Sequence, residues 1–131
     1  MPLDYIFYTE LYSYFIITFP SESYFSYKSV IPQEGVLKYI TVIYFSMSAG
    51  IVEELYFLGF FFKISGYFKN SISIYLISSP ILFSLIHWEG SLANIFSTYF
   101  FGLFASIAFL YMKNLWPLIL GHVFTDAMYF S

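Results

Sequence analysis

The sequence predicts an all-α protein, a polytopic membrane helical bundle of four to five transmembrane helices. Hydrophobic residues make up 60% of the 131 positions and charged residues only 10%, whereas a soluble domain carries about 25% charged residues. With a mean hydropathy of +0.74, the chain has too few charges to cover a surface that faces water. The length allows one domain, and we expect a lipid bilayer to surround it, in which helices satisfy their own backbone groups.

Four apolar segments approach the roughly 20 residues that a helix needs to cross a bilayer. They are joined by short turns and cover residues 39–62, 71–88, 92–112 and 115–130. A fifth stretch, 5–19, is shorter and contains Glu10, so it could cross the membrane or lie at its surface. The more polar residues 20–35 are typical of a connecting loop. These patterns divide the chain into an N-terminal helix and loop, 1–35, and a core, 36–131.

The charged residues are eight acids and five lysines, with no arginine and no cysteine. No basic patch indicates a nucleic-acid partner, and disulfides and thiolate metal sites are excluded. The N-terminus has no basic segment followed by a small-residue cleavage site, so we expect no removable signal peptide. Lysines in the 63–70 loop and the 113–114 turn predict that these connections face the cytoplasm and that the C-terminus faces outward.

Five ionisable side chains interrupt the apolar segments, although each costs about 2.5–3.5 kcal/mol at the centre of a membrane helix. Such residues usually face a polar interior and mark a functional site, and the alternative is a structural role near a helix end. The five candidates are Glu53, Glu54, His87, His122 and Asp126.

Glu53 and Glu54 are adjacent, so their side chains diverge by about 100° around the helix axis. One can face a site directly while the other flanks it or accepts a structural hydrogen bond. Glu54 precedes Lys63 by nine positions, about 13 Å along a helix, which is too deep for a side chain that only reaches for water. The small residues between Ser46 and Gly50 predict a close approach of another helix.

His122 and Asp126 are four positions apart and therefore share one helix face. An aspartate there could accept a hydrogen bond from the imidazole and fix its orientation. His87 lies beside Trp88 at a segment end, where amphipathic rings commonly anchor at the membrane interface. It also follows Lys69 by eighteen positions, about 27 Å of straight helix, which conflicts with a site shared with the glutamates unless the helix tilts or bends.

Glutamate and histidine in a water-accessible cavity favour hydrolysis. A carboxylate removed from bulk water can act as a general base, and histidines can donate to a developing oxyanion. Glu53, His87 and His122 could equally hold a divalent metal such as zinc with water as the fourth ligand, and the spacing does not decide between these readings. A small proton- or ion-coupled transporter that uses these groups as a relay is a further alternative.

The candidate residues also lie in three ordered motifs, Glu-Glu-x-x-x-Arg, Phe-x-x-x-His and His-x-x-x-Asn/Asp, with which the chain resembles the CAAX protease and bacteriocin-processing (CPBP, Abi) family. The resemblance covers about residues 36–131 and rests on three strings. They are Glu53-Glu54-Leu55-Tyr56-Phe57-Leu58-Gly59, Phe83-Ser84-Leu85-Ile86-His87 and His122-Val123-Phe124-Thr125-Asp126.

The resemblance implies an all-helical intramembrane endopeptidase that acts on a peptide or membrane-protein substrate, as a multi-pass protein of a prokaryotic plasma membrane. It implies that Glu53 activates water, that His87 and His122 assist, and that Glu54 and Asp126 support them. The motif arginine is replaced by Leu58. Without that cation, two adjacent carboxyls can hardly both be ionised, so either one of them is protonated or a histidine is charged to compensate. The alternative function is that of a non-catalytic membrane immunity or partner-binding protein.

Overall fold

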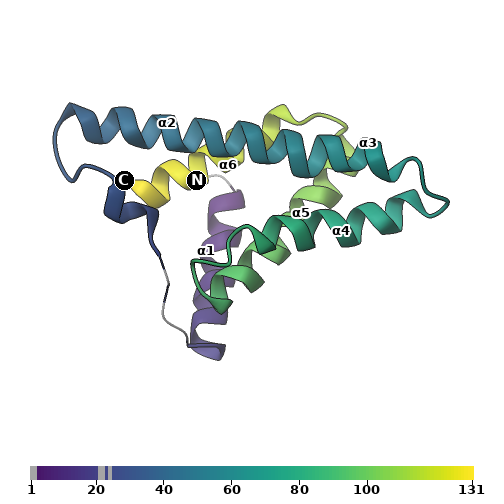
Figure 1. The fold of residues 1–131 in the computed structure, drawn as a ribbon, viewed down its shortest axis with the longest axis horizontal. Coiled ribbons are helices and arrows are strands. Elements are labelled where there is room, and N and C mark those ends of the chain that lie inside the picture. The colour runs from purple at the N-terminus through teal and green to yellow at the C-terminus, as the bar shows by residue number, and fades with distance from the viewer. Residues whose placement is uncertain (1–2, 21–22, 24) are drawn as a thin grey trace.

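The computed structural model describes residues 3–20, 23 and 25–131, and every regular element in these residues is helical. The predicted all-α class is therefore confirmed. Helix α1 (Leu3–Thr18) stands across the other helices, and a short 3-10 turn, η1 (Tyr27–Val30), precedes the next helix (Figure 1). Residues 21, 22 and 24 of the predicted loop, and residues 1 and 2 of the predicted uncleaved N-terminus, lie outside the described residues.

The second helical stretch is one continuous helix of 30 residues, Val36–Ser65. It begins after Gly35, whose φ of 80° lies in the left-handed region that glycine adopts readily. Its middle turns are π-helical, so the stretch consists of α2 (Val36–Glu53), η2 (Glu54–Phe60) and α3 (Phe61–Ser65). The sequence predicted a helix here over residues 39–62 but not the π-helical segment. Hydropathy does not distinguish the wider turns of a π-helix from those of an α-helix.

Three further helices complete the fold: α4 (Ser71–Leu85), α5 (Leu92–Met112) and α6 (Trp116–Phe130). The bounds of α5 are those predicted, and α6 begins one residue later than predicted. The predicted helix 71–88 instead ends at Leu85, because His87 and Gly90 make turn hydrogen bonds to carbonyls three residues back, at 3.1 and 3.2 Å. Ser91 then accepts a hydrogen bond from the Asn94 N–H and so caps α5.

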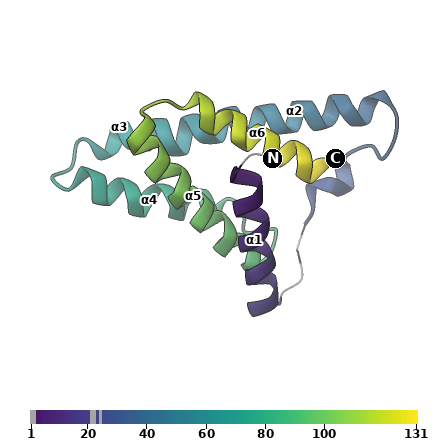
Figure 2. The ribbon, with the colours of Figure 1, turned by 180° about the vertical axis from the view of Figure 1, so that it is seen from behind.

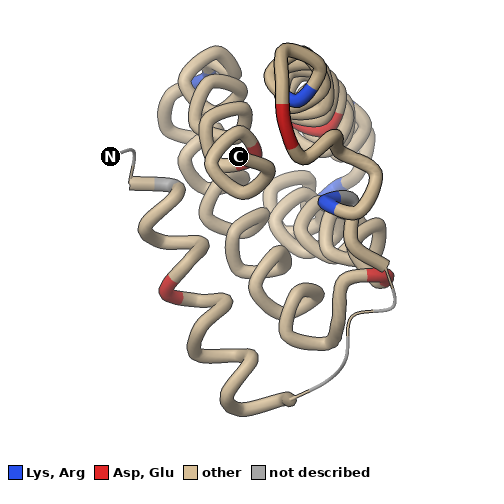
Figure 3. Tube along the Cα trace, turned by 90° about the vertical axis from the view of Figure 1, so that its left-hand side faces the viewer, with Lys and Arg blue, Asp and Glu red and all other residues tan. Residues whose placement is uncertain are grey.

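The surface is that of a membrane protein. On length and composition, Val36–Ser65 and Leu92–Met112 can cross a bilayer, and the apolar α4 is shorter. In the apolar 18-residue window of the first span, only 17% of the residues are buried within the protein, so most apolar side chains there need a nonpolar surrounding. Charged residues are sparse along the whole trace (Figure 3). The predicted helical membrane bundle is confirmed.

Close contacts between backbones hold the helices together. α2 packs mainly against α6 and α4 against α5, while α1 covers α5 and part of α6 (Figure 2). At Gly50, an added Cβ would lie 2.6 Å from Val123 Cγ2 and 3.1 Å from the Val123 nitrogen of α6. The run of small residues that predicted a close helix contact therefore makes one, and this contact brings α6 against the glutamates.

Replacing Gly50 by alanine is expected to lower the stability of the protein by about 1–3 kcal/mol, because the added methyl group overpacks the α2–α6 contact. Gly59→Ala in the same helix is the matched control. Its Cβ would meet only the flexible end of Leu115, at 3.2 Å, and alanine is the better helix former by about 1 kcal/mol. Thermal unfolding in detergent should therefore give a lower midpoint for Gly50→Ala and an unchanged or higher one for Gly59→Ala.

Candidate active site

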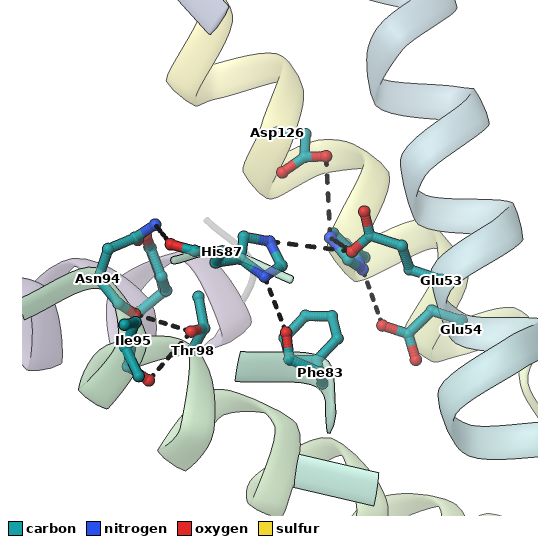
Figure 4. A network of polar contacts seen from close by, with 10 residues as sticks. Glu53, Glu54, Phe83, His87, Asn94, Ile95, Thr98 and Asp126 are labelled. Carbon is teal, nitrogen blue, oxygen red and sulfur yellow. Dashed lines mark hydrogen bonds and ion pairs between the residues drawn. The ribbon is translucent and has the colours of Figure 1, made fainter. Parts of the chain in front are cut away.

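The five candidate side chains gather between the middle of the long helix, the end of α4 and α6. Figure 4 shows four of them, Glu53, Glu54, His87 and Asp126. His122 lies at the centre and is only 5% exposed. Its Nδ1 is 2.8 Å from Glu54 Oε1, a hydrogen bond, and its Nε2 is 3.8 Å from Glu53 Oε2. The two glutamates thus diverge, as their spacing predicts, but they approach different nitrogens of the same imidazole ring.

The interaction that orients His122 comes from Glu54 and not from Asp126. Since a carboxylate oxygen accepts, the Nδ1–H of His122 donates to Glu54. Asp126 Oδ2 is 3.7 Å from Nε2, beyond hydrogen-bond distance. The four-residue spacing does place Asp126 beside the ring, at ion-pair distance from Nε2, while Nδ1 donates its hydrogen bond to a glutamate of another helix.

His87 joins the same cluster, with its Nε2 4.0 Å from Glu53 Oε2. The expected conflict in depth does not keep the two residues apart. The long helix continues past Lys63 to Ser65, α4 begins only at Ser71, and His87 lies in the turn that follows α4. His87 Nδ1 lies 2.9 Å from the Phe83 carbonyl, which can only accept. Nδ1 therefore carries a proton, and Nε2 of the neutral ring is an acceptor that faces Glu53.

Aromatic rings form the walls of the cluster. Phe83 lies 5.0 Å from the His87 ring and 5.9 Å from the His122 ring, and Phe101 of α5 lies 5.9 Å from the His122 ring. The side chains of His122 and Glu54 are 6% and 4% exposed, whereas those of His87 and Glu53 are 26% and 21% exposed. The cluster is thus closed on the Glu54 side and open on the side of Glu53 and His87.

Two carboxylate oxygens in the cluster have no hydrogen-bond partner among the described residues: Glu53 Oε2 and Glu54 Oε2, both buried. A cavity of about 10 Å³ adjoins both glutamates and is lined also by Ser79 and Phe83, room for about one water molecule. No lysine forms an ion pair with these acids in the part of the chain that is described, and the ion-pair contacts there involve histidine alone. Among the described side chains, the imidazoles are the groups placed to bring positive charge into the cluster.

Glu53, His87 and His122 have the donor chemistry of a zinc site, and the outward nitrogen of each histidine is held by an oxygen acceptor, as is usual for metal ligands. Their spacing is too wide, however. No group of three such side chains close enough to hold one metal ion is found among the described residues. Two ligands of one tetrahedral zinc at about 2.0–2.1 Å bonds lie closer together than the 3.8 and 4.0 Å that separate Glu53 from the histidines.

Sequence reasoning missed two side chains that link α1 to the cluster. The Tyr8 hydroxyl donates to Asn94 Oδ1 at 2.8 Å, and Asn94 Nδ2 donates to the His87 carbonyl at 3.3 Å. The Tyr8 ring also packs edge-on against Phe101. Neither residue could be found from the sequence, because the link joins positions 86 residues apart.

Fold and site together define a membrane-embedded protein with a buried glutamate–histidine cluster. The chain matches the family described as type II CAAX prenyl endopeptidase Rce1-like over residues 35–128, and it belongs to this family of membrane-embedded proteases. The resemblance that the motifs carried is thereby confirmed. No curated protein and no solved structure shows significant similarity to the chain.

Tyr8→Phe is expected to lower the free energy of unfolding by about 1 kcal/mol, because it removes one hydrogen bond and keeps the ring contact with Phe101. Thermal unfolding in detergent measures the change. Tyr14→Phe, at an exposed position of the same helix, is the control and should leave the midpoint unchanged. Equal midpoints for the two variants would contradict the assigned link between Tyr8 and Asn94.

Proposed function

We propose that this protein is an intramembrane endopeptidase that hydrolyses a peptide bond in a peptide or membrane-protein substrate, with Glu53 as the general base. One observation carries the proposal. The buried Glu53 Oε2 has no hydrogen-bond partner among the described residues and faces the Nε2 atoms of both histidines at 3.8 and 4.0 Å. These contacts are longer than direct hydrogen bonds, and a water molecule can bridge polar groups that do not bond directly.

The protonation of His87 suits it to hold that water. Its Nδ1–H donates to the Phe83 carbonyl, so the lone pair on Nε2 accepts one water hydrogen while Glu53 accepts the other. The water oxygen then keeps a lone pair directed at the substrate carbonyl. Two fixed acceptors therefore both orient the nucleophile and prepare it to lose a proton.

In the first step the water oxygen bonds to the carbonyl carbon and Glu53 takes a water proton. The carbonyl oxygen becomes an oxyanion, which His122 stabilises through Nε2–H, while Glu54 holds the opposite nitrogen of this ring. In the second step the carbon–nitrogen bond breaks, and Glu53 returns its proton to the leaving amine. One water is consumed, and the products are a carboxylic acid and an amine. Asp126 Oδ2, 3.7 Å from His122 Nε2, supports the positive charge of the ring.

The surroundings suit a substrate that arrives from the membrane. Two spans long enough to cross a bilayer and the shorter apolar α4 support a chain that crosses the membrane several times. The more exposed side of the cluster, at Glu53 and His87, is the side by which a peptide enters. Since the family is described by its CAAX prenyl endopeptidases, a prenylated CAAX peptide is the first substrate to test.

One observation favours a second candidate, a non-catalytic membrane protein that binds a partner. Leu58, where the family motif has arginine, is only 3% exposed and packs in an apolar cluster with Tyr75 and Phe109. No cation stands at this position to balance the glutamates. Under this alternative, Glu53→Ala preserves the cellular phenotype of the wild-type gene.

The decisive experiment incubates purified protein in lipid vesicles with a peptide library that includes prenylated CAAX peptides. Glu53→Gln and His122→Ala are each expected to lower the rate of cleavage by about a hundredfold or more, because each removes a group that acts on the transition state. Mass spectrometry of the products measures the rate.

Glu10→Gln is the matched control, since it makes the same chemical change at an exposed position on α1, and it should cleave at the wild-type rate. Each reaction is repeated with a chelator. Loss of cleavage in the presence of the chelator would show that a metal ion activates the water. Wild-type cleavage rates in both Glu53→Gln and His122→Ala would refute the proposed function.

A further inference from the structure

Ser79 of α4 makes a buried hydrogen bond to the backbone of the helix that carries the glutamates. Its hydroxyl donates to the Phe57 carbonyl at 2.7 Å, across 22 positions of sequence. The side chain is almost fully buried, at 1% exposed, and its oxygen also lies 3.3 Å from the Ser106 hydroxyl of α5. One hydroxyl thus joins three helical elements beside the glutamate cluster.

The Phe57 carbonyl lies in the π-helical segment η2. In an α-helix this carbonyl would accept from the N–H of Phe61, four residues on. Here the Phe61 N–H bonds instead to the carbonyls of Tyr56 and Leu58. The Phe57 carbonyl therefore loses its α-helical partner, and the Ser79 hydroxyl donates to it.

The π-helical segment also changes which neighbour the long helix faces. Before it, α2 packs against α6, and after it, α3 packs against α4. A widened turn rotates the residues that follow it relative to those that precede it. Within the segment itself, Glu54 meets His122 on α6 and Phe57 packs against Phe83 on α4.

We propose that Ser79 is a positioning residue for the active site: its hydrogen bond to the Phe57 carbonyl fixes the π-helical turn that aims Glu53 and Glu54 at His122. The inference rests on the proposed function for its catalytic consequence. Its structural part, the control of the contact between Glu54 and His122, can be measured without any substrate. Ser79 and the glutamates line the same small cavity, so a shift of the turn acts directly on them.

The chain has only two histidines, which makes nitrogen NMR of 15N-labelled histidine a direct readout. The signals are assigned with His87→Gln. In Ser79→Ala, the His122 Nδ1 signal is expected to move away from its wild-type position, because the Glu54 carboxylate no longer meets the ring at the same distance. If the wild-type protein cleaves the test peptide, kcat should fall about 10–100-fold, as expected for a misplaced group, with KM changed less than about twofold.

Ser78→Ala is the matched control, because the Ser78 hydroxyl donates to the Ile74 carbonyl within its own helix. It should leave both the His122 signal and kcat at wild-type values. If Ser79→Ala does not fold, Ser79→Cys tests the same bond, since a thiol has nearly the same shape but is a weak donor. It too should shift the His122 signal.

A wild-type His122 signal in a folded Ser79→Ala or Ser79→Cys protein overturns the proposal, and so does an equal shift in Ser78→Ala. A shifted His122 signal in Ser79→Ala alone, with no cleavage by the wild-type protein, supports the positioning role and refutes the proposed function. The two hypotheses can therefore fail separately.

Discussion

The architecture of this protein depends on the hydrogen bond between His122 and Glu54, 2.8 Å long and almost fully buried. Each group would be costly to place alone in an apolar interior, where an uncompensated charge is far less stable than in water. Together they satisfy one another, and the pairing ties α6 to the long helix. The close contact at Gly50 makes this pairing possible, because a side chain there would separate the two helices. The close helix contact and the buried hydrogen bond therefore depend on each other.

The π-helical segment at Glu54–Phe60 affects how the long helix packs against both α6 and α4. A regular helix keeps residues three and four positions apart on one face, whereas a widened turn rotates the residues that follow it relative to those that precede it. The π-helical segment also removes the α-helical partner of the Phe57 carbonyl, to which Ser79 donates. It also carries Leu58 into the apolar cluster with Tyr75, Ala105 and Leu118. The absence of an arginine at this position is consistent with the surrounding structure, which offers apolar packing there.

Some of the many aromatic residues surround the polar cluster, which composition alone does not reveal. Phe83 and Phe101 border the His122 ring, and both also pack in one cluster with Phe57. Elsewhere on α5, Phe15 of α1 stacks on Phe96 and Phe100. Rings of this size bury much apolar area with few rotatable bonds. They build rigid walls around a polar cluster and attach an N-terminal helix that lies outside the family match.

The sequence by itself determined the helical membrane class, the bounds of α5 and the identity of the titratable side chains, because hydropathy and helical spacing are local properties that survive without a fold. It also indicated that Glu53 and Glu54 differ in role, since adjacent side chains diverge around a helix axis. Only the tertiary structure decided that Glu54 rather than Asp126 hydrogen-bonds to His122, that His87 reaches Glu53, and that Tyr8 and Asn94 link α1 to the cluster. Those decisions depend on how separate helices cross and on one widened turn, and both are set by packing between residues far apart in the chain.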